Sequence, residues 1–220
     1  MPDASLTERL AAKQISPEDL AQQAFKDPAL LAAVVRGLSS SQPQARYGCA
    51  KAARLIASER PASLVSHADA FFRLLDSDNN ILKWTAIDVL GCLAAQERSG
   101  DVTRLTQRLC RFLSCGNLIT ANHAIGALAR IAVARNALRD EIAGELLKVE
   151  GYSFDTEECR NIALGKVVAA LDMFVDDLSD KREAFAFVER QTSNTRNSTR
   201  KKADALLRKR GISSKPHRPD

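Results

Sequence analysis

The chain has 220 residues, enough for one large domain or two small ones with a substantial buried core. Aromatic residues make up only 5% while alanine and leucine are abundant, so the composition favours packed helices over strands and predicts an all-α protein. The net charge of +5 is unevenly placed, because residues 179–220 hold 12 Lys or Arg against 5 Asp or Glu and the rest of the chain is close to neutral.

No stretch approaches the roughly 18 uninterrupted apolar residues that a membrane span needs, and the N-terminus lacks a basic segment followed by an apolar run. We therefore expect a cytoplasmic protein, or a nuclear one if the source is eukaryotic, without membrane association. The cysteines include no C-x-x-C pair, and four of the five fall within apolar helical patterns. Buried thiols are predicted rather than metal ligands or a disulfide framework for the set Cys49, Cys92, Cys110, Cys115 and Cys159.

Two short helices are predicted at the start of the chain, over residues 6–13 and 20–25. The second follows the start signal Ser16-Pro17-Glu18-Asp19, in which proline at the first helical position and acids in the first turn favour initiation. We expect residues 1–27 to form an N-terminal helical cap. Asp27-Pro28 then opens a third helix.

From residue 28 onward the chain repeats itself with a period of 37 to 39 residues. At a shift of 38, for example, Ala86 and Leu90 fall on Ala124 and Leu128. We interpret the aligned segments as the second helices of helix pairs, each preceded by a first helix. The predicted second helices are 45–57, 82–94, 120–132 and 159–171, and the predicted first helices are 64–75, 102–113 and 138–149.

A weaker last pair is predicted over 180–189 and 198–209, where the second helix keeps only a thin apolar stripe. The end of a stacked array must show a polar face to water, so a capping role is expected. The predicted organisation after the N-terminal cap is repeats over 28–178, a basic C-terminal capping repeat over 179–210, and a disordered tail over 211–220.

Residues 76–90 carry the pattern D-x-D-x-x-[IV]-[LR]-[KR]-x-x-A-x-x-x-L, which resembles HEAT repeats. The resemblance covers residues 28–175 well and 179–210 loosely, but 39–43 offers Ser and Pro in place of Asp and 114–117 contains no acid. It implies a right-handed α-solenoid of about five helix pairs whose second helices line a concave face. Armadillo-type repeats are the alternative, although they usually carry a third short helix that the sequence does not show.

Stacked helix pairs leave a long open surface, which favours binding over chemistry. One side of each second helix points away from the predicted core, and aromatic and amide side chains there can hold an extended peptide. A protein or peptide partner on the concave face is therefore predicted. The alternative is that these side chains pack between repeats or are solvated. The predicted partner-binding residues are Tyr47, Trp84, Asp88, Asn122 and Asn161.

The basic C-terminal end gives a second hypothesis, a nucleic-acid-binding repeat protein that neutralises phosphates. No aromatic residue follows Phe187, so stacking on bases is not available there, and a solvated cap is the alternative. The candidate residues are Arg196, Arg200, Lys201, Lys202, Arg208, Lys209 and Arg210.

A further basic series occupies one aligned position near the start of the second helices: Arg46, Lys83 and Arg160. We expect these side chains to pair with turn acids of the adjacent repeat, with Asp76 or Asp78 serving Arg46 or Lys83, rather than to form a stripe for phosphates.

Catalytic fingerprints are absent from the sequence, so a non-enzymatic scaffold or adaptor without a cofactor is predicted. Some solenoids that the chain resembles are DNA glycosylases or bilin lyases, which remain the enzymatic alternative. The turn 76–80 opens like a calcium loop, but Ile81 and Ile87 stand where such a loop needs Gly and Glu, so we predict a helix-capping turn. The histidines lack ligand partners in sequence, and no metal site is expected; the oligomeric state is not indicated.

Overall fold

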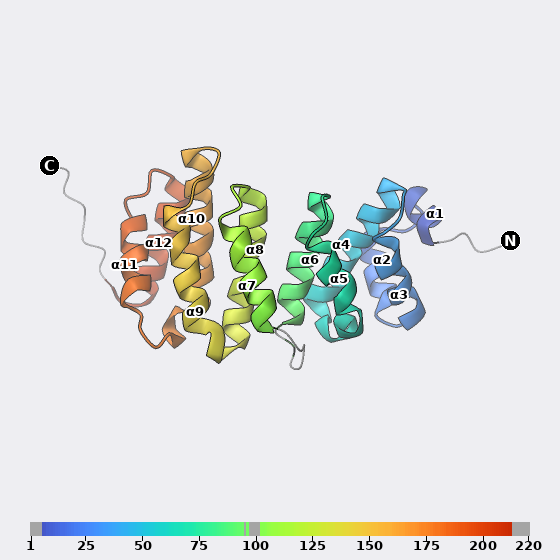
Figure 1. Ribbon diagram of the computed structural model, residues 1–220, viewed down its shortest axis with the longest axis horizontal. Coiled ribbons are helices and arrows are strands. Elements are labelled where there is room, and N and C mark those ends of the chain that lie inside the picture. The colour runs from blue at the N-terminus through green and yellow to red at the C-terminus, as the bar shows by residue number, and fades with distance from the viewer. Residues whose placement is uncertain (1–5, 95, 97–101, 213–220) are drawn as a thin grey trace. The chain divides into compact units, whose positions relative to one another are not determined.

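The computed structural model describes residues 6–94, 96 and 102–212. Within these ranges the chain forms twelve α-helices and three 3₁₀ segments, without a strand (Figure 1). None of the described helices is long and apolar enough to cross a membrane. The chain divides into two compact units, Met1–Gly100 (unit 1) and Asp101–Asp220 (unit 2), and each is described by itself.

Unit 1 is organised around α4, which packs against α2 on one side and α6 on the other. Its core is built from small and aliphatic side chains of these helices together with the fully buried ring of Phe71. The elements are α1 (Leu6–Ala11), α2 (Pro17–Ala24), α3 (Pro28–Gly37), α4 (Pro43–Glu59), η1 (Pro61–His67), α5 (Ala68–Leu74) and α6 (Asn80–Leu93).

Side-chain caps fix the starts of three helices in unit 1. Ser16 accepts a hydrogen bond from the backbone N–H of Asp19, and Asp27 accepts from the first turn of α3. Asn79 accepts from the backbone N–H groups of Ile81 and Leu82. These bonds satisfy donors that a helix leaves unpaired at its N-terminus. The start signals at 16–19 and 27–28 and the capping turn before α6 are therefore confirmed.

The single helix predicted over residues 64–75 is wrong. The segment begins as the 3₁₀ helix η1 at Pro61 and continues as α5 only from Ala68. His67, at the junction, has φ −108° and ψ 6°, which lies in the bridge region between helical and extended backbone. The repeat thus contains an extra short helical segment before α6, a feature that the apolar pattern alone did not separate.

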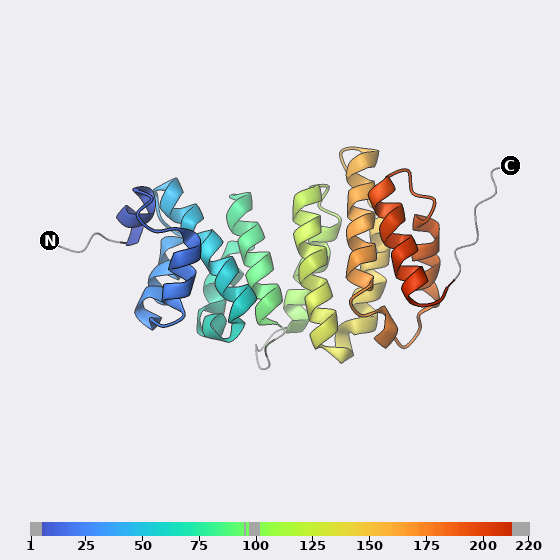
Figure 2. The same ribbon diagram turned by 180° about the vertical axis from the view of Figure 1, so that it is seen from behind.

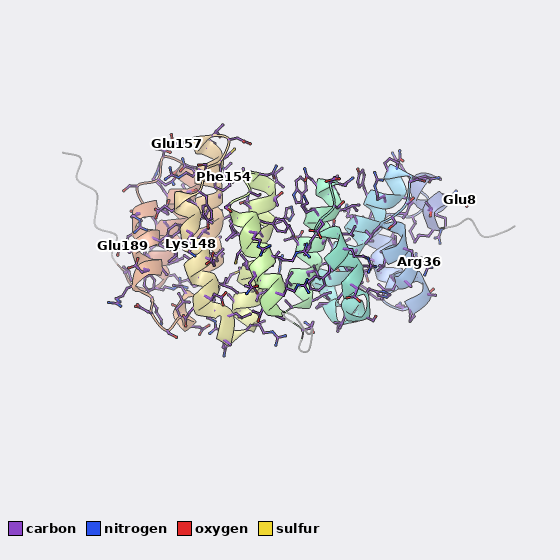
Figure 3. The ribbon with its side chains drawn as sticks, in the orientation of Figure 1. Glu8, Arg36, Lys148, Phe154, Glu157 and Glu189 are labelled. Atoms are coloured by element: carbon purple, nitrogen blue, oxygen red, sulfur yellow. The ribbon has the colours of Figure 1, made fainter. Side chains whose placement is uncertain are left out.

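Unit 2 has two rows of helices. The second helices α8, α10 and α12 lie side by side, as Figure 2 shows in yellow-green, orange and red, and α10 packs against both of its neighbours. The first helices α7, α9 and α11 pack behind them; Lys148 and Glu189, labelled in Figure 3, belong to this first-helix side. The elements are α7 (Val102–Leu113), α8 (Leu118–Ala134), α9 (Asn136–Leu147), η2 (Lys148–Gly151), α10 (Glu157–Leu171), η3 (Val175–Asp177), α11 (Arg182–Gln191) and α12 (Asn197–Lys209).

All five cysteines are free thiols, so the disulfide alternative is excluded in this structure. Cys49 is 1% exposed and acts as a core residue, whereas Cys115, in the turn before α8, is exposed. Burial raises the pKa of Cys49 and of Cys110 to about 11, and Glu145 adds to the effect at Cys110. Both thiols are thus protonated and unreactive near neutral pH.

Candidate functional site

The aligned position on α4 holds Tyr47, whose ring is half-buried. Its hydroxyl accepts hydrogen bonds from Asn79 Nδ2 at 3.0 Å and from Arg46 Nη2 at 3.3 Å, and the Arg46 guanidinium lies 5.0 Å from the ring centroid. The hydrogen bonds from Asn79 and Arg46 lower the pKa of the phenol. Tyr47 therefore ties α4 to the capping turn of the next repeat while part of its ring stays accessible.

The aligned position on α6 holds Trp84, which is half-buried, with Asp88 one turn later. The Asp88 carboxylate pairs with Arg54 Nε of α4 at 2.9 Å, and Lys51 of α4 pairs with Glu18 of α2 at 2.6 Å. In unit 1, these charged positions of the second helices are thus neutralised by their neighbours.

In unit 2 the aligned position on α8 holds Asn122. Its side chain is half-buried, and its Oδ1 atom is out of contact with solvent and lacks a hydrogen-bond partner within the described residues. Leaving a buried acceptor unpaired costs about 1–3 kcal/mol, so native proteins rarely do so without a reason. A donor from outside the chain would remove this cost once the half-buried Asn122 side chain turns its oxygen toward the surface.

The next aligned residue, Asn161 on α10, is placed differently, and the prediction that it lies on the binding surface must be corrected. It is 6% exposed; its Nδ2 donates to Thr195 Oγ1 at 2.8 Å and its Oδ1 accepts from Asn194 Nδ2 at 2.9 Å. Asn194 also donates to Gln191, which donates to Glu150. The Asn161 amide is therefore paired through both its oxygen and its nitrogen in a polar network that joins α10 to the C-terminal repeat.

Most of the basic C-terminal candidates also have partners within the chain. Arg210 is the most enclosed, with only 9% of its side chain exposed, and it binds Asp172 and Asp176 near the end of α10. Lys201 and Arg208 remain exposed, without a hydrogen bond or ion pair to any described residue. The others bind as follows: Arg196 to Glu158, Arg200 to the carbonyls of Asn194 and Thr195, Lys202 to the carbonyl of Gly165, and Lys209 to Asp172.

The predicted ladder between basic residues of the second helices and turn acids is not formed by Arg46. Its guanidinium donates instead to the Ser40 carbonyl and to Tyr47. Lys83 and Arg160 make no ion pair with any part of the chain that the structure describes. Polar links at the repeat spacing do occur elsewhere in unit 2, between residues 38 to 40 positions apart: Arg190 with Glu150, Ser179 with Asp140, and Arg210 with Asp172. The repeat spacing was therefore predicted correctly, but the residues that link adjacent repeats differ from those expected.

The Arg210 cluster predicts a pH dependence of stability. Burial opposes ionisation of Asp172, but hydrogen bonds from Arg210 and Lys209 lower its pKa on balance, and the hydrogen bond from Arg210 lowers that of Asp176. Carboxyls with a lowered pKa stabilise the fold above their unfolded pKa and lose this effect as the pH falls through the folded pKa. We expect Arg210→Gln to lower the free energy of unfolding by about 1 kcal/mol at pH 7, a small effect because both carboxylates are open to solvent.

Thermal unfolding of the wild type and Arg210→Gln from pH 7 to pH 2.5 checks this expectation. The difference between the two proteins should shrink below about pH 4, where the carboxyls become protonated. A difference that stays constant across this range would show that Arg210 acts through packing alone.

Two side chains that the sequence pattern did not single out lie close together in unit 2. A Cβ built at Gly126 of α8 would stand 3.8 Å from Lys166 Nζ of α10 and 3.9 Å from Arg130 Nη1 of α8. Gly126 is one helical turn after Asn122 and one turn before Arg130, so all three share a face of α8. A basic surface here could have been predicted from the sequence of α8, which contains no acidic residue.

Within the described ranges, no group of three or more His, Cys, Asp or Glu side chains is arranged to hold a metal ion. His67 lies at the end of η1 and His123 on α8, and His217 lies outside the described residues, as does 213–220 of the predicted tail.

Solved structures with a similar fold include designed armadillo repeat proteins. One, YIII(Dq)4CqI, has a TM-score of 0.62 and 19% identity over 94% of both chains. A second, YIII(Dq.V1)4CPAF in complex with the peptide (KR)4, has a TM-score of 0.60 and 18% identity over 92% of this chain and 89% of its own. A third, computationally designed for modular peptide recognition, has a TM-score of 0.62 and 19% identity over the same shares.

The chain has the α-solenoid fold of stacked helix pairs that the designed armadillo repeat proteins also have. The predicted all-α solenoid is thereby confirmed, and the armadillo-type alternative describes its structural neighbours. No protein-family model matches the sequence, and no curated protein matches it. At identities below 20%, the similarity of this chain to the designed proteins establishes the fold alone.

Proposed function

We propose that this protein is a non-enzymatic armadillo-type scaffold that binds an extended peptide segment of a partner protein through its second helices. The observation that carries the proposal is the unpartnered, buried Oδ1 of Asn122. A backbone N–H of an extended peptide is a donor of the right kind for this atom, and pairing the two removes the penalty of the unmet acceptor.

Two further features support peptide binding. Tyr47 and Trp84 place half-buried aromatic rings at the equivalent positions of unit 1, and such rings bury the apolar parts of a peptide at little cost in side-chain entropy. One of the designed proteins of similar fold was solved with a bound peptide, (KR)4. The nucleic-acid alternative is less well supported, because five of its seven candidate side chains bind partners within the chain.

A display selection of random 12-residue peptides against the full chain tests the proposal, with the affinity of enriched peptides measured by fluorescence anisotropy. Asn122→Ala should weaken them about 5- to 10-fold, the effect of one hydrogen bond in a desolvated site, and should leave the melting temperature unchanged or raise it, because it removes an unpaired acceptor from the free protein. Trp84→Ala should weaken peptides that bind unit 1. Failure to enrich any peptide would contradict the proposal. A lowered melting temperature with unchanged peptide affinity in both variants would mean that Asn122 and Trp84 contribute to packing rather than to binding.

A further inference from the structure

The space beside Gly126 is bordered by two cations. Lys166 Nζ and Arg130 Nη1 lie within 4 Å of the point where a side chain would begin, and glycine leaves that point open. Arg130 Nη1 is shielded from solvent and lacks a hydrogen-bond partner, although a guanidinium N–H is a strong donor. A donor in this state is arranged for an acceptor that the described chain does not supply.

A third cation extends the cluster to α12. Lys202 Nζ donates to the carbonyl of Gly165, the residue before Lys166 on α10. Burial lowers the pKa of Lys202, and the charges of Lys166 and Arg196 lower it further. The neighbouring charges that shift the pKa of Lys202 are therefore positive, and no carboxylate is among them. Arg130, Lys166 and Lys202 thus form a basic cluster that runs across α8, α10 and α12, and we call it the cationic strip.

The helices that carry the cationic strip contain few acidic residues that could neutralise its positive charge. Helix α8 contains no Asp or Glu, α10 carries Glu157 and Glu158 only in its first turn, and α12 contains Asp204 alone. Glu158 pairs with Arg196. None of the three cations of the strip forms an ion pair with a described residue, in contrast to unit 1, where α4 pairs its charges with α2 and α6. Like charges held close together destabilise the free protein, and an anionic ligand would reverse that effect.

We propose that the cationic strip binds an acidic peptide segment of the partner protein, with its carboxylates over Gly126 between Arg130 and Lys166. This inference rests on the proposed function and names the chemistry of the segment that unit 2 selects. Asn122, one turn away on the same face of α8, takes a backbone N–H of that segment while the strip takes its side chains. Such a segment is opposite in charge to the peptide (KR)4 with which one designed neighbour was solved.

A peptide fits this surface better than a nucleic acid does. Helices α8, α10 and α12 contain no Phe, Tyr or Trp on which bases could stack. The unmet acceptor of Asn122 requires a donor, and every peptide residue except proline presents a backbone N–H, whereas a DNA backbone has no donor and an RNA backbone offers only its 2′-hydroxyl groups. Guanidinium and ammonium groups, in turn, form their strongest hydrogen bonds with carboxylates and phosphates.

Anisotropy titrations of the full chain with three fluorescein-labelled 12-residue peptides test the inference. One alternates Asp with Ser, one alternates Asn with Ser, and one alternates Lys with Ser. The acidic peptide should bind at least about 10-fold tighter than the other two, and its affinity should fall as salt rises. Lys166→Glu and Lys202→Glu should each weaken it about 10-fold or more, because each variant replaces an attraction by a repulsion.

Lys201→Glu is the matched control. It changes the net charge by the same amount on the same helix, but its position lies about 100° around the helix from Lys202. It should alter the affinity by less than about 2-fold. Equal losses in Lys201→Glu and Lys202→Glu would mean that overall charge, rather than the strip, attracts the peptide, and would overturn the inference.

A pair of glycine variants separates binding from stability. Gly126→Ala places a methyl group in ordinary contact with Lys166 and Arg130 and fills the proposed site, while Gly144→Ala on α9 meets nothing within 4 Å. Both should raise the melting temperature by about 2 °C, since alanine favours helix interiors, but only Gly126→Ala should weaken the acidic peptide. Unchanged affinity in Gly126→Ala would place the ligand elsewhere.

The remaining outcomes are also decisive. Tighter binding of the neutral or basic peptide would overturn the acidic preference and leave the scaffold proposal standing. A 12-nucleotide single-stranded RNA that binds tighter than the acidic peptide, and loses affinity in Lys166→Glu, would assign the strip to nucleic acid. Absence of binding by all three peptides would overturn the inference, and the independent display selection would then decide the scaffold proposal.

Discussion

Asn161→Ala is expected to lower the free energy of unfolding by about 2–3 kcal/mol, the largest effect that we predict for a single polar substitution. The substitution removes the acceptor of Asn194 and the donor to Thr195 at the junction between α10 and the C-terminal repeat. Buried polar groups that lose a partner keep their desolvation penalty, and neighbours in the same network are weakened with them. Equilibrium unfolding in urea, followed by circular dichroism, measures the loss.

Asn122→Ala is the matched control, because Asn122 occupies the same position in the preceding repeat. Its Oδ1 makes no hydrogen bond to the described chain, so the substitution removes an unpaired buried acceptor and should leave the free energy of unfolding unchanged or raise it, by up to about 1–3 kcal/mol. Equal losses in the two variants would contradict the assignment of one asparagine to the fold and the other to a ligand.

Gly165→Ala is expected to destabilise the protein by about 1–2 kcal/mol, although the same change in an unobstructed helix is stabilising. A Cβ at this position would stand 2.5 Å from Thr199 Oγ1 and 3.3 Å from Thr199 Cβ. The hydroxyl cannot turn away freely, because it donates to the Asn161 carbonyl at 2.8 Å. The close approach of α12 to α10 therefore requires glycine, and thermal unfolding of the variant measures the clash.

A double-mutant cycle with Thr199→Ala identifies the source of this effect. Removing the hydroxyl should recover about 1 kcal/mol of the loss in Gly165→Ala, a coupling typical of residues in contact. Additive effects of the two substitutions would show that the penalty arises from the backbone of α10 rather than from Thr199. Gly144→Ala, with open space around its position, supplies the stabilising reference.

The helices and their period could be read from the sequence because they depend on local signals and on apolar spacing. The caps at Ser16, Asp27 and Asn79 act within three residues, and the second helices α4, α6, α8 and α10 carry a broad apolar face. The break at His67 was missed because η1 and α5 both bury apolar side chains, Leu64 and Phe71, so their pattern reads as one helix.

The candidate site could be predicted only in part, for a reason specific to repeats. Aligning repeats compares equivalent positions, and it placed Asn122 and Asn161 together although their surroundings differ. Only Asn161 meets Asn194 and Thr195, which lie in the turn of the last repeat. The alignment cannot reveal a cluster made from positions that are not equivalent.

Arg130 and Lys166 illustrate this limit. At a shift of 39 residues, Arg130 corresponds to Ala169 and Lys166 to Ala127, so neither belongs to an aligned basic series. Their approach beside Gly126 follows from the packing of α8 against α10, which the sequence pattern does not specify. The basic C-terminal run is the converse case, because most of its charges bind partners within the chain that the sequence pattern does not identify.

The central claim is that the second helices, rather than the first, form the binding surface. Two-dimensional ¹H–¹⁵N correlation spectra of the labelled full chain, recorded with and without the tightest peptide from the display selection, test it most directly. We predict that the amide shifts that change on binding lie on second helices, above all around Asn122 and Gly126 of α8 and along α10 and α12. Changes confined to the first helices α7, α9 and α11, or to α5, would contradict it.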